Sequence, residues 1–305
     1  MLVKSLWGAM VEWLREIGSF WGAVFERMDK THMTLIAAGV AFYAMFAVFP
    51  GLAAIIALWS LWFDPLVVLT YLDVAHEFLP DGASDIVDDQ VTTLTQNGRT
   101  SVGWTSFISF MIATIAARAG VDALIRGLNA AYGVRAHSTI FGFLLAYGLT
   151  LVIVGISLAG LATIVVVPVL LNFMVFAPVR STLLTVLPWA GMFLLVIVTI
   201  GVLYRYGPNV KTPRTPIFTW GALFAAVLWS AGSIAFSAYL GSFNSYNRIY
   251  GSIGTVVALL MWFYLAGFSV LLGALINVEL ARRRRMRAVR EARRGFTELL
   301  AEKNG

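Results

Sequence analysis

The sequence predicts an all-α polytopic membrane protein with six transmembrane helices and an N-terminal interfacial amphipathic helix. Two observations lead to this fold class. First, 59% of the 305 residues are hydrophobic and only 12% are charged, whereas a soluble domain carries about 25% charged residues. Second, six stretches without Asp, Glu, Lys or Arg each reach the roughly 18 residues that cross a bilayer as a helix. The composition therefore excludes a soluble globular enzyme and a disordered scaffold.

The first predicted element is an amphipathic helix over residues 1–30. Large apolar side chains recur there at helical spacing, among them Trp7, Leu14 and Trp21, and the charged residues fall largely on other faces. Because a membrane span follows directly, we expect this helix to lie at the inner membrane interface; a partner-binding helix is the alternative. Glu12 and Arg15 interrupt the apolar run, so a cleaved signal peptide is not predicted.

The second predicted unit is a membrane domain over residues 31–280. Backbone groups in lipid need internal hydrogen bonds, so we expect the spans to be helices. Unbroken apolar runs such as residues 164–167 do not show the alternation of a β-barrel. The six predicted spans are Thr34–Trp62, Ser101–Ala117, Phe141–Leu171, Leu183–Tyr204, Phe218–Leu240 and Ile253–Val278.

The charges of the connecting segments predict the orientation, because Lys and Arg concentrate on the cytoplasmic side. The loop 63–100 carries seven acidic residues and one arginine, so we expect it outside. The segments 118–135 and 205–214 and the tail 281–305 are basic, which places both termini in the cytoplasm. The net charge of +6 is therefore an orientation signal, and no nucleic-acid partner is expected. The tail is expected to contact anionic lipid headgroups; RNA binding is the alternative.

No cofactor and no metal site is predicted. The chain has no cysteine, and His32, His76 and His137 show no metal-binding spacing. Four carboxylates in the outer loop could clamp a divalent cation together with His76, but a solvated outer helix accounts for the same spacing. These carboxylates belong to Asp73, Glu77, Asp81 and Asp85.

The ends of spans 2 and 6 that face the cytoplasm contain the candidate inner polar site. If the second helix continues to Tyr132, four of its polar residues fall within an arc of about 80°, with Asp122 between two arginines. Glu279 is expected to be neutralised by the arginines that follow it, or by an arginine of span 2. The stripe is either a solvated helix extension or the lining of a path for a charged headgroup. The site consists of Arg118, Asp122, Arg126, Asn129, Asn277 and Glu279.

A candidate outer rim lies between spans 5 and 6. This segment is rich in hydrogen-bonding side chains close to the predicted outer interface. It is either a tight turn or a surface that binds lipid headgroups. The residues concerned are Asn244, Asn247, Arg248 and Tyr250.

Four ordered segments resemble the YihY/BrkB family of inner-membrane proteins. They are AAGVAFYAMFAVFP at 37–50, LIRGLNAAYGV at 124–134, YGSIG at 250–254 and LGALINVEL at 272–280. The resemblance covers roughly residues 10–282, and it departs from the family at Leu275, where members often have an acidic residue. It implies a six-span protein of the bacterial cytoplasmic membrane. Members were formerly labelled ribonuclease BN, and envelope-lipid transport is a recurrent suggestion for them.

These observations together predict a transporter-like membrane protein that binds or translocates an amphipathic envelope lipid. The alternative is a non-transporting structural or envelope-assembly factor, and a homo-oligomer is compatible with either. A ribonuclease would need a metal cluster or a general acid–base pair, and the sequence shows neither, so we predict no catalytic residue. An ion or solute channel would need charged residues at mid-membrane, and the centres of the predicted spans have none.

Overall fold

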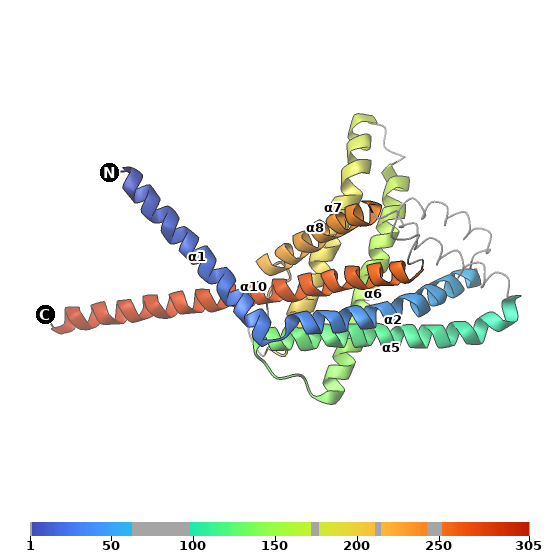
Figure 1. Cartoon of the computed structure of the whole chain (residues 1–305), viewed down its shortest axis with the longest axis horizontal. Helices are drawn as coiled ribbons and strands as arrows, with labels where there is room; N and C mark the ends of the chain where they lie inside the picture. The colour runs from blue at the N-terminus through green and yellow to red at the C-terminus, as the bar shows by residue number, and fades with distance from the viewer. Residues whose placement is uncertain (1, 63–97, 172–176, 211–214, 243–251, 305) are drawn as a thin grey trace.

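The computed structural model describes residues 2–62, 98–171, 177–210, 215–242 and 252–304. These residues form seven α-helices and, within the described ranges, no β-strand, which confirms the all-α class (Figure 1). The helices are α1 (Leu2–Lys30), α2 (Met33–Trp62), α5 (Gly98–Tyr132), α6 (Thr139–Leu171), α7 (Ala177–Tyr206), α8 (Trp220–Ser242) and α10 (Ser252–Asn304).

The predicted span Phe218–Leu240 starts two residues before α8, and the other five predicted spans lie inside one helix each. Two helices, α5 and α10, continue well beyond the predicted ends. No proline interrupts α5 after the predicted end at Ala117, and the helix stops at Gly133, which has a φ of 65°. The N–H of Gly133 donates to the carbonyl of Ala130, and that of Val134 to Asn129. These two bonds form the Schellman motif that commonly ends a helix at glycine.

Membrane-spanning length and composition are met by four described segments, in α5, α6, α8 and α10. A fifth candidate is the bent pair formed by α1 and α2, and the described apolar part of α7 is the shorter segment Ala190–Tyr206. The protein is therefore a multi-pass membrane protein with four or five candidate spans in the described residues. The predicted total of six membrane spans stays a prediction.

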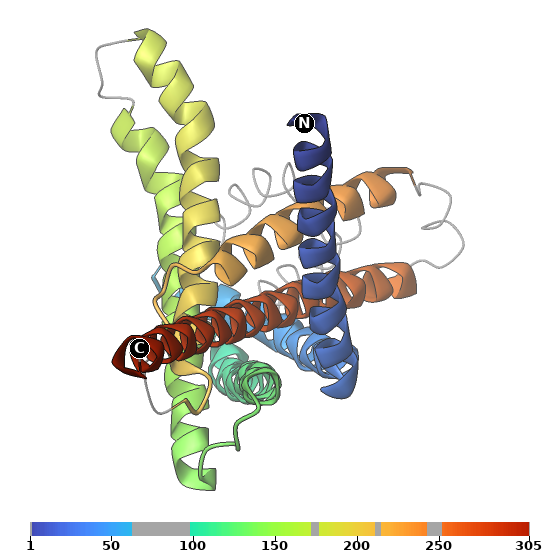
Figure 2. The same cartoon turned by 90° about the vertical axis from the view of Figure 1, so that its left-hand side faces the viewer.

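Five of the described helices form two groups (Figures 1 and 2), and α8 packs against α10. α2, α5 and α10 run side by side, and small residues bring them close together: Gly127 of α5 lies against Ile36 of α2 and Leu271 of α10. α6 and α7 pack on each other and cross this group steeply in both views. Because the two groups cross steeply, they cannot both lie along the membrane normal. At least one group must therefore be tilted from the normal by more than the usual ~20°.

The helix α1 leaves the bundle at a bend of 61° relative to α2. His32 forms the bend with a φ of 52°. The C-terminal half of α1 packs on the bundle: Val24 is buried, and the rings of Trp21 and Phe224 of α8 lie 5.7 Å apart. Toward the N-terminus of α1, Trp13 is exposed, and the interfacial position of this part of the helix stays a prediction.

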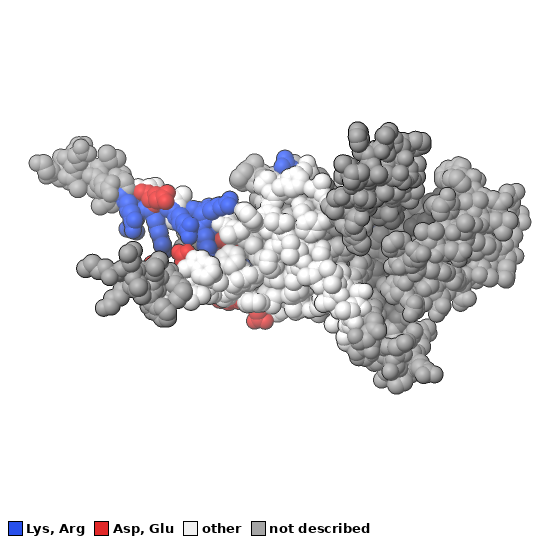
Figure 3. Space-filling view, turned by 90° about the horizontal axis from the view of Figure 1, so that it is seen from above, with Lys and Arg blue, Asp and Glu red and all other residues white. Residues whose placement is uncertain are grey.

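In the part of the chain that the structure describes, most charged side chains in this view gather at one end, where α1 and the C-terminal part of α10 project (Figure 3). The α10 extension there carries the arginines of the predicted basic tail. Most of the described bundle surface in this view bears no charge. This distribution agrees with a bundle that lies in lipid and a basic end that lies in water.

Candidate functional site

Three charged residues of α5 form what we name the α5 stripe: Arg118, Asp122 and Arg126. The Arg126 Nε donates to Asp122 Oδ2 at 2.8 Å, and the side chain of Arg126 is 70% exposed. Arg118 turns the other way, so that its guanidinium carbon lies 4.4 Å from the ring centroid of Phe143 on α6. Of the two arginines expected beside Asp122, the structure pairs one with it.

The charge of the α5 stripe is not balanced within the described residues. Its two arginines and one aspartate leave one positive charge. Arg118 contacts the rings of Phe143 and Tyr147, and no described carboxylate lies within ion-pair distance of it. A cation–π contact stabilises a guanidinium but does not neutralise it. The stripe is therefore suited to bind an anionic group.

Asn129 continues the polar face of α5, but it is buried and has a different partner. Its side-chain oxygen accepts the backbone N–H of Asn209 at 2.8 Å, and the Asn209 amide donates to the carbonyl of Arg135 at 3.1 Å. These bonds attach the segment after α7 to the end of α5. The Asn129 Nδ2 has no hydrogen-bond partner in the part of the chain that the structure describes.

Asn277 of α10 caps the start of α8. Its Oδ1 accepts the N–H of Gly221 at 2.9 Å, and its Nδ2 donates to Thr219 Oγ1 at 2.9 Å. The same Thr219 oxygen accepts the N–H of Ala222, as an N-cap residue does. Gly221 and Gly273 lie so close that a Cβ on either would collide with the other's carbonyl oxygen. Asn277 therefore has a structural partner away from the α5 stripe.

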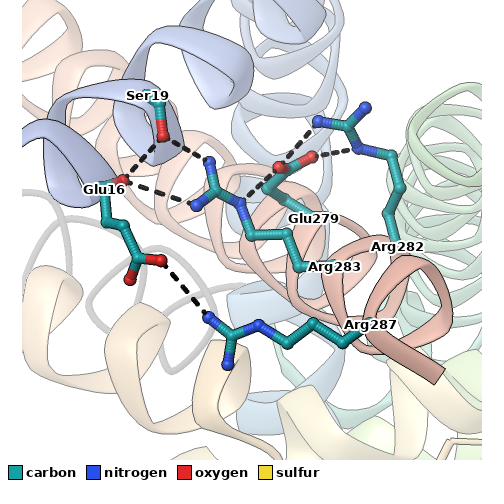
Figure 4. Close-up of polar contacts among 6 residues, drawn as sticks. All are labelled: Glu16, Ser19, Glu279, Arg282, Arg283 and Arg287. Atoms are coloured by element: carbon teal, nitrogen blue, oxygen red, sulfur yellow. Dashed lines mark hydrogen bonds and ion pairs between the residues drawn. The ribbon is translucent and has the colours of Figure 1, made fainter. Parts of the chain in front are cut away.

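Glu279 lies at the junction of α1 and α10 (Figure 4). Its carboxylate is 3% exposed and accepts bonds from Arg282 at 2.7 and 2.9 Å and from Arg283 at 2.8 Å. Arg283 also donates to Ser19 Oγ of α1 at 3.1 Å, and Arg287 pairs with Glu16 at 3.7 Å. We name these residues the α1–α10 clamp.

The clamp decides between the two sets of partners expected for Glu279. The following arginines, and not an arginine of span 2, neutralise its carboxylate. The six residues of the candidate inner site are thus separated: three form the α5 stripe, Asn129 binds the segment after α7, Asn277 caps α8 and Glu279 belongs to the α1–α10 clamp. Whether the stripe has a function stays a prediction.

Several expected groups lie outside the described residues. These are the four residues of the outer rim at 244–250 and the acidic group of the outer loop at 73–85. Within the described ranges, no group of three or more His, Cys, Asp or Glu side chains could hold a metal ion.

Tyr204 is a buried polar residue that the sequence did not single out. It is fully buried at the end of α7, and its hydroxyl donates to the carbonyl of Val270 on α10 at 2.5 Å. Phe143 and Tyr147, which contact Arg118, were also not expected. Their positions depend on how α6 and α7 cross the other helices, and no local pattern reports that crossing.

Comparison with known proteins gives one family and a set of relatives that cover most of the chain. The model of the family described as virulence factor BrkB matches residues 24–296. The ribonuclease-like protein YfkH of Bacillus subtilis is 29% identical over 88% of this chain and 97% of its own length.

Two relatives are named UPF0761 membrane proteins. The one from Cronobacter sakazakii is 27% identical over 93% of this chain and 94% of its own length. The one from Aeromonas salmonicida is 24% identical over 84% and 87%. No solved structure matches the chain.

Proposed function

Because the chain belongs to the virulence factor BrkB family, we propose that it is a transporter-like membrane protein that binds or translocates an amphipathic envelope lipid. One observation carries the proposal: the α5 stripe reaches the bundle surface through the exposed Arg126, and within the described residues one of its positive charges has no carboxylate partner. Ionisable groups on membrane helices are expensive and commonly mark the path of a charged substrate. An anionic or zwitterionic lipid headgroup has the complementary charge.

The same proposal includes a location and an orientation. We place the protein in the bacterial cytoplasmic membrane, with both termini in the cytoplasm. The supporting observation is that α1 and the C-terminal part of α10 project from one end of the bundle, the end that carries the arginines (Figure 3). In this orientation the first turn of the tail, Arg282–Arg285, contacts anionic headgroups.

We further propose that the protein is not an enzyme and takes no cofactor and no nucleic-acid partner. The name of the Bacillus subtilis relative refers to ribonucleases, but the three charged residues of the stripe offer no general base with a partner acid. The basic residues of α10 are accounted for by the clamp and by the inner-face charge bias.

A second candidate, a non-transporting structural or assembly factor, is favoured by the α1–α10 clamp. The clamp orders two helices that project from the bundle, and such helices can present a docking surface. In this case the α5 stripe would be a polar surface of α5 that has no effect on lipid binding or transport.

Lipid movement in proteoliposomes tests the proposal. We expect purified protein to accelerate exchange of a labelled phospholipid between leaflets, and Asp122→Ala and Arg126→Ala to reduce that rate while inserting normally. Glu26→Ala is the matched control, because Glu26 forms an exposed ion pair with Lys30 at the same spacing on α1. Unchanged exchange in both stripe variants, or equal losses in the control, would contradict the proposal.

A further inference from the structure

The register of the helices shows how deep the α5 stripe lies. Gly127 of α5 faces Leu271 of α10, and Leu271 precedes Glu279 by eight residues, or about 12 Å along a helix. Arg118 lies a further eight residues from Arg126, about another 12 Å in the same direction. If the charged residues from Glu279 onward mark the membrane surface, the whole stripe lies well inside it.

The contact of α5 with α2 gives a second measure of depth. Gly120 faces Tyr43, which follows the start of α2 at Met33 by ten residues, or about 15 Å. Along the shared direction of α2, α5 and α10, the two measures place Asp122 between about 12 and 20 Å from the charged ends of the helices. Half the hydrocarbon thickness is ~15 Å, so Asp122 lies near mid-membrane.

The surroundings of the stripe agree with this depth. At the same level on α2, Phe42 and Phe46 are 51% and 58% exposed. On α6, Phe143 and Leu144 beside the stripe are 49% and 62% exposed. Large apolar side chains that face outward at one level are expected where the bundle contacts acyl chains. The stripe therefore opens sideways toward lipid.

We propose that the stripe, with the neighbouring face of α6, is a lateral site for the phosphodiester of an anionic phospholipid. This rests on the proposed function and adds the ligand's chemistry and its route. A guanidinium that has no carboxylate partner among the described residues is costly inside the hydrocarbon layer, and one monoanionic phosphodiester balances the stripe's single positive charge. Arg118 binds the phosphate through its planar fork of donors. The acyl chains lie on the exposed side chains of Phe143 and Leu144.

Asp122 determines which of the two arginines the lipid phosphate contacts first. Its carboxylate holds Arg126 at 2.8 Å and repels a phosphate, so the lipid contacts Arg118 first. Arg126 is 70% exposed, and it can exchange the aspartate for the phosphate when a lipid arrives. The lipid therefore enters beside Arg118, where α5 meets the exposed face of α6.

Depth is tested first, by spin labels on single cysteines in the cysteine-free chain. Labels at Phe42 and Leu144 should be accessible to oxygen and protected from a water-soluble nickel chelate. A label at the exposed Val289 of the α10 extension is the control and should show the opposite. Chelate access at Phe42 and Leu144 equal to that at Val289 would overturn the lateral site, whatever the transport assay shows.

Lipid retention tests the chemistry. Protein in nanodiscs of mixed phosphatidylglycerol and phosphatidylcholine is extracted, and the retained lipids are measured by native mass spectrometry. Arg118→Gln should reduce the preference for phosphatidylglycerol about tenfold, the loss expected for one bond to a charged group. Asp122→Asn should raise it, because the competing carboxylate is gone. Arg118→Lys should retain part of the preference, which separates lost charge from misfolding.

Two further arms identify the source of the phosphate. Arg290→Gln in the tail should leave retention unchanged, and millimolar inorganic phosphate should not displace the lipid. Equal losses in Arg118→Gln and Arg290→Gln, or displacement by free phosphate, would contradict a lateral lipid site. Normal retention without lipid exchange supports the site and refutes transport, whereas exchange that is unaffected by Arg118→Gln refutes the site alone.

Discussion

Replacing Glu279 with Gln removes the carboxylate that joins Arg282 to Arg283. Three bonds to a charged group would contribute about 4 kcal/mol in a dry site. Arg282 is 49% exposed and Arg283 is 26% exposed, so water can hydrate both arginines and offset part of this contribution. We therefore expect the free energy of unfolding to fall by about 2 kcal/mol. Equilibrium unfolding in mixed detergent micelles, followed by tryptophan fluorescence, measures the change.

A double-mutant cycle shows whether the loss belongs to the clamp. Glu279→Gln, Arg283→Gln and the double variant should couple by more than ~0.5 kcal/mol, the limit for independent sites. Glu291→Gln, an exposed glutamate farther along α10, is the control and should change stability by less than ~0.5 kcal/mol. A change at Glu279 no larger than that at Glu291, or additive losses in the cycle, would refute the reasoning.

Three further predictions follow from the close contacts, the charge pattern and the missing acid–base group. Gly273→Ala should destabilise the protein by about 1–3 kcal/mol, because the added methyl meets Gly221 and Ala225. The control is Gly232→Ala on α8, whose added methyl meets nothing within 4 Å and which should be neutral or stabilising. Equal effects of the two substitutions would contradict the Gly221–Gly273 contact. A cysteine at Ser84 should react with an impermeant maleimide in intact cells and one at Thr212 should not; labelling at Thr212 alone would reverse the orientation. Purified protein should not cleave RNA, and co-purifying cleavage that His137→Ala abolishes would disprove this.

Local sequence patterns predicted the helices well because each span depends on its own residues. Uncharged length alone located five of the six predicted spans inside helices of the structure, and the remaining span, Phe218–Leu240, starts two residues before α8. The same rule ended the second span at Ala117, where the first charge appears, although α5 continues to Tyr132. The conclusion that the centres of the predicted spans carry no charge came from this ending, and it does not cover the charged part of α5 from Arg118 to Arg126.

The partners of the candidate site residues could not be predicted in the same way. A helical wheel correctly placed Asp122 beside Arg126, because that pair depends on α5 alone. It also grouped Asn129 with the stripe, but Asn129 bonds to the segment after α7. Glu279 has local partners that sequence could suggest, yet its attachment to Ser19 through Arg283 joins residues 264 positions apart. Such pairs depend on how whole helices pack.

The continuous helix α10 also has a mechanical consequence. It is 53 residues long, about 80 Å, and residues 274–294 contain neither glycine nor proline, so this part acts as a stiff lever of ~30 Å. A rotation of about 10° in the membrane would swing the far end of that lever by ~5 Å. The clamp would move α1 with it, and a pair of distance probes on the bundle and on α10 could record each such swing.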